Sequence, residues 1–244
     1  MRHIRGMSFP GQVFSLAREF FFPQVCALCG GSLIGASEIR YGLCGLCYAE
    51  MSPDQGERCN LCGKPLISEK GTCLSCRNGA EKPYDRLWAL FPYTGKFRKL
   101  LTAYKFKKNL ALANFFAEKI TEIIAANPVL QNAGIVPVPP RPGKIKETGW
   151  DQIDRLVRRL EKTGQGRIQV YRCMKRRKSK VQKRLGRAER MENLKGRIFL
   201  HGAAPQTALV IDDVITTGST MEVCSSVLKA SGVGKVYGLC LFYD

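Results

Sequence analysis

The sequence lacks an apolar run that could cross a membrane. A membrane-spanning helix needs about 20 apolar residues in a row, whereas the Phe-rich residues 14–22 are interrupted by Arg18 and Glu19. The N-terminus also lacks the long apolar stretch ending in small residues that marks an export signal. We therefore expect a cytoplasmic protein without a membrane span. Residues 14–22 are better interpreted as a short helix packed on the cysteine-rich region than as a membrane anchor, because their apolar face is short.

Acidic residues are also scarce. The 244 residues include 20 Asp and Glu against 39 Lys and Arg, which gives a formal net charge of +19. This excess goes beyond what solubility needs and favours polyanionic partners, either nucleic acid or multiply phosphorylated ligands. With 45% hydrophobic residues, the chain is long enough for one core of ordinary size and a small additional module.

Eight of the eleven cysteines lie between positions 26 and 76, and all eight fall into Cys-x-x-Cys pairs. Disulfide-bonded secreted domains favour varied gaps, whereas this spacing is typical of metal ligands in a reducing compartment. Eight thiolates are enough for two tetrahedral zinc sites, which would be structural because no ligand position stays open to water. The predicted zinc ligands are Cys26, Cys29, Cys44, Cys47, Cys59, Cys62, Cys73 and Cys76.

Two aspects of these metal sites stay open. Sequential pairing of neighbouring Cys-x-x-Cys units is simplest, but interleaved pairing, as in cross-braced zinc fingers, also fits the spacing. An iron–sulfur cluster is the weaker alternative because the tight cysteine runs of ferredoxins are missing. We interpret the remaining cysteines, Cys173, Cys224 and Cys240, as ordinary semi-buried residues.

Beyond the cysteines, apolar strands alternate with amphipathic helices. Strands are predicted at residues 85–91, 134–139, 198–200, 208–211 and 235–242. Helices are predicted over residues 96–127, with a break near Asn109, over 150–160, and over 219–230, which Gly232 would close. This alternation favours an α/β fold with a mainly parallel sheet flanked by helices. We expect a small cysteine-rich zinc-binding domain at residues 1–80 and the α/β domain at residues 81–244.

The most informative motif is Ala-Leu-Val-Ile-Asp-Asp-Val-Ile-Thr-Thr-Gly-Ser-Thr at residues 208–220. A buried strand, two acids and a Thr- and Gly-rich turn precede a helix, and the N-terminus of such a helix offers unpaired N–H groups to a phosphate. Asp212 and Asp213 would repel the phosphate but can accept hydrogen bonds from sugar hydroxyls, so a sugar phosphate suits both halves. An acidic strand end before a Ser/Thr-capped helix is the alternative, but the complete spacing favours binding.

This motif resembles the thirteen-residue phosphoribosyl-diphosphate motif of the type I phosphoribosyltransferases. The resemblance implies that Asp212 and Asp213 are the catalytic acids and hold the ribose 2′- and 3′-hydroxyls, while the following turn cradles the 5′-phosphate. It also implies Mg²⁺ bound with the phosphoribosyl diphosphate. The phosphoribosyl-binding residues are then Asp212, Asp213, Ile215, Thr216, Thr217, Gly218, Ser219 and Thr220.

Further segments make the resemblance more specific. They are Tyr104-Lys-Phe106, Val136-Pro-Val-Pro139, Gly149-Trp-Asp-Gln152, the spaced Gln182, Leu185, Arg190 and Asn193, and the cysteine-rich N-terminus. Together they resemble the ComF/GntX family over nearly the full chain. The resemblance implies a phosphoribosyltransferase-like protein that acts in DNA uptake during natural transformation. Its implied ligand is phosphoribosyl diphosphate or a nucleotide, and its implied partners are single-stranded DNA and a DNA-uptake helicase.

Two alternatives to this function are a non-catalytic, zinc-containing scaffold that binds single-stranded DNA, and a phosphoribosyltransferase of nucleotide salvage. The chain shows no recognisable nucleobase pocket, so transferase activity and its acceptor stay open. A diphosphate leaving group would need cationic neighbours. Such enzymes place their diphosphate loop after the strand at 134–139, which predicts Val138, Pro139 and Arg141 as diphosphate-binding residues. Lys144, Lys146 and Arg190 are further candidates, although a solvated surface charge is the plainer interpretation of any one of them.

Basic segments are the candidates for a DNA-binding track. Residues 96–108 hold six basic residues with interleaved aromatics, and residues 172–190 hold ten with a single acid. Unpaired bases need exposed aromatic platforms, but we expect Phe97 and Phe106 to lie in the core. Residues 172–190 cannot pack as core and are expected to form a flexible surface loop, or a cover ordered by an anionic ligand.

The phosphate motif begins more than 130 residues after Cys76. We therefore expect each domain to fold around its own centre. A truncated chain starting near Pro83 would then keep the phosphoribosyl site.

Overall fold

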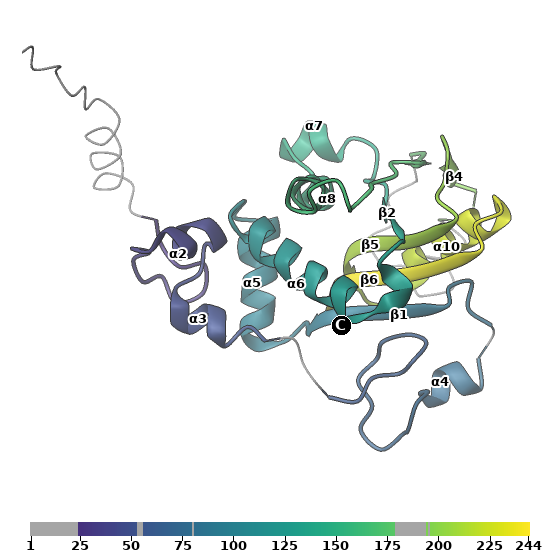
Figure 1. Cartoon of the computed structure of the whole chain (residues 1–244), viewed down its shortest axis with the longest axis horizontal. Coiled ribbons are helices and arrows are strands. Elements are labelled where there is room, and N and C mark those ends of the chain that lie inside the picture. The colour runs from purple at the N-terminus through teal and green to yellow at the C-terminus, as the bar shows by residue number, and fades with distance from the viewer. Residues whose placement is uncertain (1–23, 53–55, 80, 179–193, 195) are drawn as a thin grey trace, which may run out of the picture.

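The computed structural model describes residues 24–52, 56–79, 81–178, 194 and 196–244 (Figure 1). The helix predicted at residues 14–22 and the basic residues 179–190 lie outside these ranges. Among the described residues, the elements in chain order are α2 Ala36–Tyr41, α3 Gly45–Ala49, α4 Leu74–Arg77, β1 Arg86–Pro92, α5 Gly95–Lys105, α6 Leu112–Ala126, the 3₁₀ helix η1 Pro128–Leu130, β2 Gly134–Pro137, α7 Lys144–Thr148, α8 Gln152–Thr163, β3 Met174–Arg176, β4 Ile198–Leu200, β5 Thr207–Ile215, α10 Ser219–Ala230 and β6 Lys235–Tyr243.

A four-stranded parallel sheet with the order β1-β6-β5-β2 forms the centre of the described chain. In its register, Ile135 of β2 pairs with Leu209 of β5, and Ile211 of β5 pairs with Leu239 of β6. The middle strands β5 and β6 are nearly continuous runs of buried residues, as expected for strands covered on both faces. The predicted α/β fold with a mainly parallel sheet is therefore confirmed.

Helices cover both faces of this sheet. On one face α5, α6 and α8 pack their apolar sides against the strands, so that Leu156 and Leu160 belong to the same buried cluster as Leu209. On the other face Cys224 of α10 belongs to a second cluster with Val210. Successive residues of a strand point to opposite faces, so β5 contributes to both clusters by alternation.

The predicted helix boundaries are close to those observed. The break expected near Asn109 separates α5 from α6, and Lys108 in this break has a left-handed φ of 54°. After α10, the N–H of Gly232 donates to Lys229 O at 3.0 Å and the N–H of Val233 donates to Leu228 O at 3.1 Å. This pair of bonds is the Schellman motif, which requires the left-handed φ of 92° at Gly232.

A small antiparallel pair, β3 with β4, lies outside the main sheet. The expectation that residues 172–190 stay out of the core is wrong at its beginning, because Cys173 and Met174 are 2% and 6% exposed. These two apolar side chains join the α10-side cluster together with Ile198 of β4. Cys224 and Cys240 are also fully buried rather than semi-buried.

The cysteine-rich region forms two units, which we call the first ribbon (residues 24–52) and the second ribbon (residues 56–79). They lie apart in Figure 1, the first beside α5 and α6 and the second beside β1. The phenols of Tyr41 and Tyr48 donate hydrogen bonds to Glu118 of α6. In the second ribbon, Leu61 O accepts the N–H of Leu87 in β1 at 2.9 Å. Each ribbon therefore packs directly on the α/β domain.

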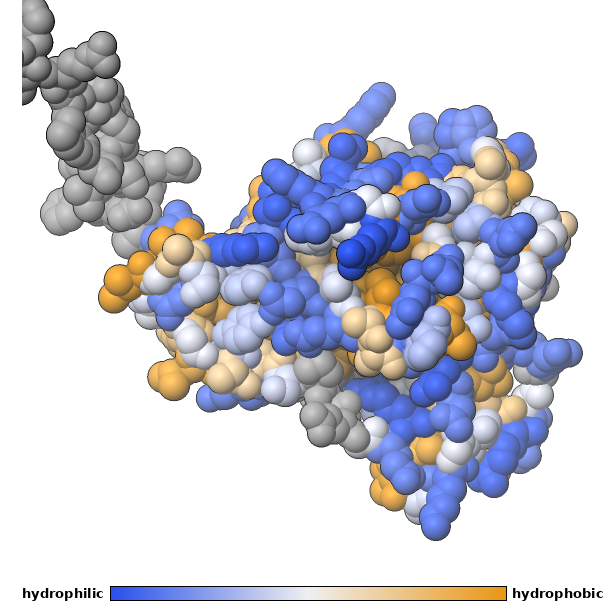
Figure 2. Space-filling model, in the orientation of Figure 1, coloured by the Kyte–Doolittle hydropathy of each residue, from blue (hydrophilic) through white to orange (hydrophobic). Residues whose placement is uncertain are grey.

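The face of the molecule seen in Figure 2 is largely hydrophilic, in keeping with the net charge, and its hydrophobic patches are small. Within the described ranges, no helix has both the length and the apolar character that crossing a membrane requires.

Candidate functional site

The sulfur atoms of the two ribbons form two groups, each compact enough to hold one metal ion. The first group is Cys26, Cys29, Cys44 and Cys47, and the second is Cys59, Cys62, Cys73 and Cys76, with all sulfurs of a group within 4.8 Å of one another. The sulfurs of Cys29 and Cys44 are 3.7 Å apart, as are those of Cys62 and Cys73. Four sulfurs at about 2.3 Å from a tetrahedral zinc ion lie about 3.8 Å from one another. The eight predicted ligands thus fit two structural zinc ions, and their pairing is sequential.

Backbone N–H groups favour the thiolate form of one cysteine in each group. The N–H groups of Cys62 and Cys73 lie 3.5 and 3.4 Å from the sulfur of Cys59. Burial raises the pKa of Cys59, but these N–H groups and that of Leu61 outweigh it and lower the pKa to about 6. The same balance of burial against backbone N–H groups lowers the pKa of Cys26 to about 6. Since zinc binds thiolate, both pockets are prepared for the metal.

The second candidate site lies at the carboxyl edge of the sheet. β2 ends at Pro137, beside Ile211, whereas β5 continues to Ile215 along β6. Asp212 and Asp213 therefore belong to β5 and lie just beyond the end of β2. Ligands of open parallel sheets bind at such an edge.

The environments of the two aspartates set their pKa values apart. Burial, followed by the neighbouring charge of Asp213, raises the pKa of Asp212. For Asp213, which is 7% exposed, burial acts in the same direction, but the ammonium of Lys105 outweighs it and holds the pKa below its ordinary value. One carboxylate is thus fixed in its ionised form, while the other holds its proton more tightly.

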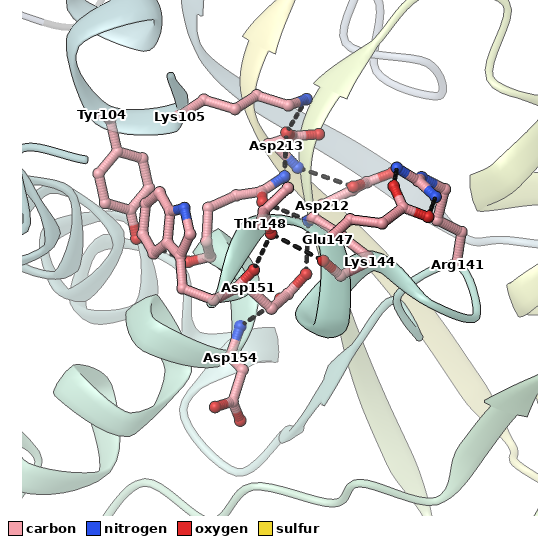
Figure 3. Close-up of polar contacts among 12 residues, drawn as sticks. Tyr104, Lys105, Arg141, Lys144, Glu147, Thr148, Asp151, Asp154, Asp212 and Asp213 are labelled. Atoms are coloured by element: carbon pink, nitrogen blue, oxygen red, sulfur yellow. Dashed lines mark hydrogen bonds and ion pairs between the residues drawn. The ribbon is translucent and has the colours of Figure 1, made fainter. Parts of the chain in front are cut away.

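Asp213 is the centre of a polar network that joins three helices (Figure 3). Its carboxylate accepts hydrogen bonds from Lys105 Nζ at 2.5 Å and from Gln152 Nε2 at 2.6 Å. Lys144 donates in turn to Gln152 Oε1, and to Asp151 Oδ2 at 2.5 Å. Two lysines thus balance two aspartates, which explains how these charges persist in a partly buried position.

Three local features position this network. Asp151 is the N-cap of α8 and accepts the N–H of Asp154 at 2.8 Å. The buried phenol of Tyr104 donates to Gln152 O at 2.6 Å. Lys105 occupies the last turn of α5, so its position depends on the packing of Tyr104 beside it.

Asp212 interacts electrostatically with strand β3. Electrostatic attraction to Asp212 favours the charged form of Arg176 of β3, although burial, the larger effect, lowers the pKa of that guanidinium. The Nε atom of Arg176 is buried and has no hydrogen-bond partner among the described residues. A buried donor of this kind is rare in proteins and favours a ligand acceptor near it.

The predicted diphosphate residues follow β2, and Arg141, the one cation among them, already has a partner. Val138 and Pro139 are buried, and the N–H of Val138 donates to Ile211 O at 3.0 Å. The guanidinium of Arg141 forms a two-bond ion pair with Glu147, which raises the pKa of Arg141 and lowers that of Glu147. Lys146 is exposed, and Arg190 lies outside the described residues.

The predicted phosphate loop lies between β5 and α10. Gly218 precedes α10 with a left-handed φ of 79°, a conformation that glycine adopts without strain. The hydroxyls of Thr217 and Ser219 are 2.9 Å apart and share a hydrogen bond. The first turn of α10 has N–H groups without partners inside the helix, and these adjoin the loop.

Sequence reasoning from chemistry alone missed Lys105 and Asp151 as members of the site. Lys105 lies 108 positions from Asp213, and no spacing rule connects a helix end to a distant strand. The only signal was the resemblance, since Tyr104-Lys-Phe106 and Gly149-Trp-Asp-Gln152 were both among its motifs.

Comparison with known proteins agrees with the two zinc groups and with the family resemblance seen in the sequence. Residues 17–77 match the double zinc ribbon domain family. The chain is 25% identical to the competence protein ComFC of Streptococcus pneumoniae, over 86% of this chain and 96% of that protein. It is also 25% identical to competence protein F of Haemophilus influenzae (88% and 95% covered) and to the DNA utilization protein YhgH of Escherichia coli K12 (90% and 96% covered). The resemblance to the ComF/GntX family is therefore confirmed by relatives that span nearly the whole chain.

Proposed function

We propose that the chain binds 5-phosphoribosyl diphosphate, together with Mg²⁺, at the carboxyl edge of its parallel sheet. The observation that carries the proposal is the position of Asp212 and Asp213 in the C-terminal part of β5, with the loop of residues 216–218 and the N-terminus of α10 directly after that strand. The phosphate end of the ligand lies on the loop N–H groups and the hydroxyls of Thr216, Thr217, Ser219 and Thr220. Ile215, the residue before this loop, is buried and lines the same pocket as the loop.

The ribose end of the ligand lies on the two carboxylates. Asp213 is held ionised by Lys105, so it accepts a hydrogen bond from a sugar hydroxyl. Asp212 has the raised pKa and adds a second contact on the side of Arg176, whose buried Nε needs an acceptor. These separate environments support the assignment of one hydroxyl to each acid.

Among the predicted diphosphate residues, Arg141 is the better candidate and Lys144 the weaker one. The Arg141–Glu147 pair is half-exposed, and an exposed ion pair contributes little to stability, so a diphosphate can replace Glu147 at little cost. Lys144 is held by the buried Asp151, and breaking a buried pair is much more costly. Mg²⁺ would add positive charge to the diphosphate.

We further propose a role in DNA uptake, by analogy with the competence proteins that the chain resembles over nearly its full length. The phosphoribosyl site has two alternative roles. In one, the chain transfers the phosphoribosyl group to an acceptor at the same site; in the other, it binds the ligand without catalysis. Release of pyrophosphate from phosphoribosyl diphosphate distinguishes the two.

A specific observation supports contact with single-stranded DNA. Phe106, expected in the core, is 68% exposed at the end of α5, so that expectation is wrong, whereas Phe97 is partly buried and stacks on Phe91. The exposed lysines Lys107 and Lys108 follow Phe106 directly. An exposed ring beside cations is the arrangement on which unpaired bases stack while phosphates are neutralised.

Calorimetric titration with phosphoribosyl diphosphate tests the main proposal. We expect magnesium-dependent binding that is lost when Asp212→Ala and Asp213→Ala are combined. Glu161→Gln serves as the matched control, because Glu161 is an acid of α8 that pairs with Arg172 away from the site. Equal affinity of the double variant and the wild type would refute the assignment of the two acids.

A further inference from the structure

The second ribbon and the phosphate loop line one common pocket. This pocket has a volume of about 190 Å³ and is lined on one side by the ribbon residues Lys64 and Ser75 with three of the zinc-binding cysteines. Residues 215–218 and Tyr243, at the end of β6, line the other side. A metal-binding unit encoded some 140 positions earlier thus faces the loop proposed to hold the ligand phosphate.

The ribbon is anchored in this position by backbone contacts with β1. Leu61 O accepts the N–H of Leu87 at 2.9 Å, and Leu61 packs against the same apolar cluster as Leu87. Gly63 has a φ of 71°, and a side chain there would place its Cβ 2.7 Å from Leu87 O. Only glycine permits this close approach, so the turn between Cys62 and Lys64 is fixed against the sheet.

Two lysines, Lys64 and Lys82, and one acid, Glu222, line the pocket beside three of the zinc-binding cysteines. Glu222, in the first turn of α10, is the acid in the lining of the pocket, and it forms an ion pair with Lys82 at 2.6 Å in which both side chains are largely buried. That pair offsets the negative charge of Glu222. Lys64 also lines the pocket, is exposed, and forms no ion pair of 4.0 Å or less with a described residue.

We propose that the second ribbon completes the phosphate end of the site, with Lys64 supplying positive charge to a phosphate monoester held by residues 216–218. Zinc at the Cys59 group holds Lys64 in place, since Lys64 O accepts the N–H of Cys59 at 2.8 Å. This inference rests on the proposed phosphoribosyl site and extends it. A chain starting near Pro83 lacks the second ribbon, so under this inference it lacks part of the site, in contrast to the expectation from the sequence.

The first test compares Lys64→Met with Lys70→Met, an exposed lysine of the same ribbon that does not line the pocket. Calorimetric titration uses phosphoribosyl diphosphate with Mg²⁺, and ribose 5-phosphate. We expect Lys64→Met to weaken binding of both ligands about tenfold or more, as for loss of one charge-assisted hydrogen bond, and Lys70→Met to leave it unchanged. Wild-type affinity in Lys64→Met would overturn this inference alone, whereas a wild type that binds neither ligand would refute the proposed function and this inference with it.

The second test uses the two zinc groups as each other's control. Cys73→Ser with Cys76→Ser removes ligands beside the pocket, and Cys44→Ser with Cys47→Ser removes the equivalent ligands of the first ribbon. Zinc content should fall from two ions to one in both variants, and only the first variant should lose affinity for ribose 5-phosphate. Equal affinities in the two variants would overturn the link between zinc and the pocket. If the second-ribbon variant does not fold, Lys64→Met decides the question.

Discussion

The ammonium of Lys105 lies 2.5 Å from the carboxylate of Asp213, although 108 positions separate the two residues. The pair joins the C-terminal end of α5 to the strand that carries the phosphate motif. Asp213 is nearly buried, so its charge depends on this partner and on Gln152. The site is therefore held in shape by a helix that lies far from β5 along the chain.

Loss of the lysine should destabilise the fold through the carboxylate that it leaves behind. We expect Lys105→Met to lower the free energy of unfolding by about 1–3 kcal/mol, since a buried charged acceptor would lose a partner. The double variant Lys105→Met with Asp213→Asn should recover part of that loss because no unpaired carboxylate remains at position 213. Urea unfolding of the wild type, both single variants and the double variant measures the coupling. Additive effects of the two substitutions would contradict the pairing.

Asp212 should make stability depend on pH. Burial, and then the charge of Asp213, raises its pKa to about 8, whereas an aspartate in the unfolded chain titrates near about 3.9. The folded state therefore holds an extra proton between these values, and the stability from it is lost as pH rises through about 8. Asp212→Asn cannot lose this proton, so its stability relative to the wild type should increase between about pH 5 and pH 8, by at most about 1.4 kcal/mol per pH unit.

Urea unfolding of both proteins at each pH measures this difference, and the paired comparison cancels the titration of the zinc ligands. Glu81→Gln, which replaces an exposed acid, serves as the control. A stability difference between Asp212→Asn and the wild type that stays constant from pH 5 to pH 8 would contradict the raised pKa.

Arg141 and Lys144 should respond differently to the same loss of charge. Arg141→Gln should weaken binding of phosphoribosyl diphosphate about tenfold, as for removal of one charge-assisted hydrogen bond, and leave ribose 5-phosphate binding and stability unchanged. Lys144→Gln should instead lower stability, because Asp151 and Gln152 lose their shared donor. Titration of both ligands, together with urea unfolding, separates the two roles. Loss of both ligands in Arg141→Gln would place Arg141 outside the diphosphate end.

Single-stranded DNA should bind through Phe106 and the lysines beside it. We expect Phe106→Ala to lose about 1–3 kcal/mol of binding free energy, the usual contribution of one stacked base. Ile34→Ala, which removes an exposed apolar side chain of the first ribbon, should have no effect. Fluorescence anisotropy with an oligonucleotide measures the affinity of both variants, and equal affinity of Phe106→Ala and the wild type would exclude the ring as a platform.

The two lysines after Phe106 should make this binding sensitive to salt. A lysine that neutralises one phosphate of a single strand contributes about 0.7 to the slope of log affinity against log salt. Lys107→Gln and Lys108→Gln should each reduce that slope by about this amount, because each removes one cation. A salt series by fluorescence anisotropy measures the slope, and unchanged slopes in both variants would place the DNA backbone elsewhere.

Several features were predictable because they depend on short-range spacing. The Cys-x-x-Cys pairs place two sulfurs on one turn, and the inward positions Ile153, Leu156, Val157 and Leu160 recur at helical spacing and are all buried in α8. Phe106 was not predictable in this way. Its ring follows the last turn of α5, where the chain leaves the helix, and the packing of Tyr104 decides which side of the chain faces the core.

The sequence by itself determined the zinc-binding residues, the alternation of strands and helices, and the place of the phosphate loop between a strand and a helix. Each of these depends on contacts between residues that are close along the chain, so a local pattern is enough to encode it. Only the tertiary structure decided that Lys105 and Gln152 meet Asp213, that the cysteine pairs are sequential, and that the second ribbon faces the phosphate loop. Those relationships arise when distant segments bury apolar surface against the same sheet, and no spacing along the chain specifies which segments become neighbours.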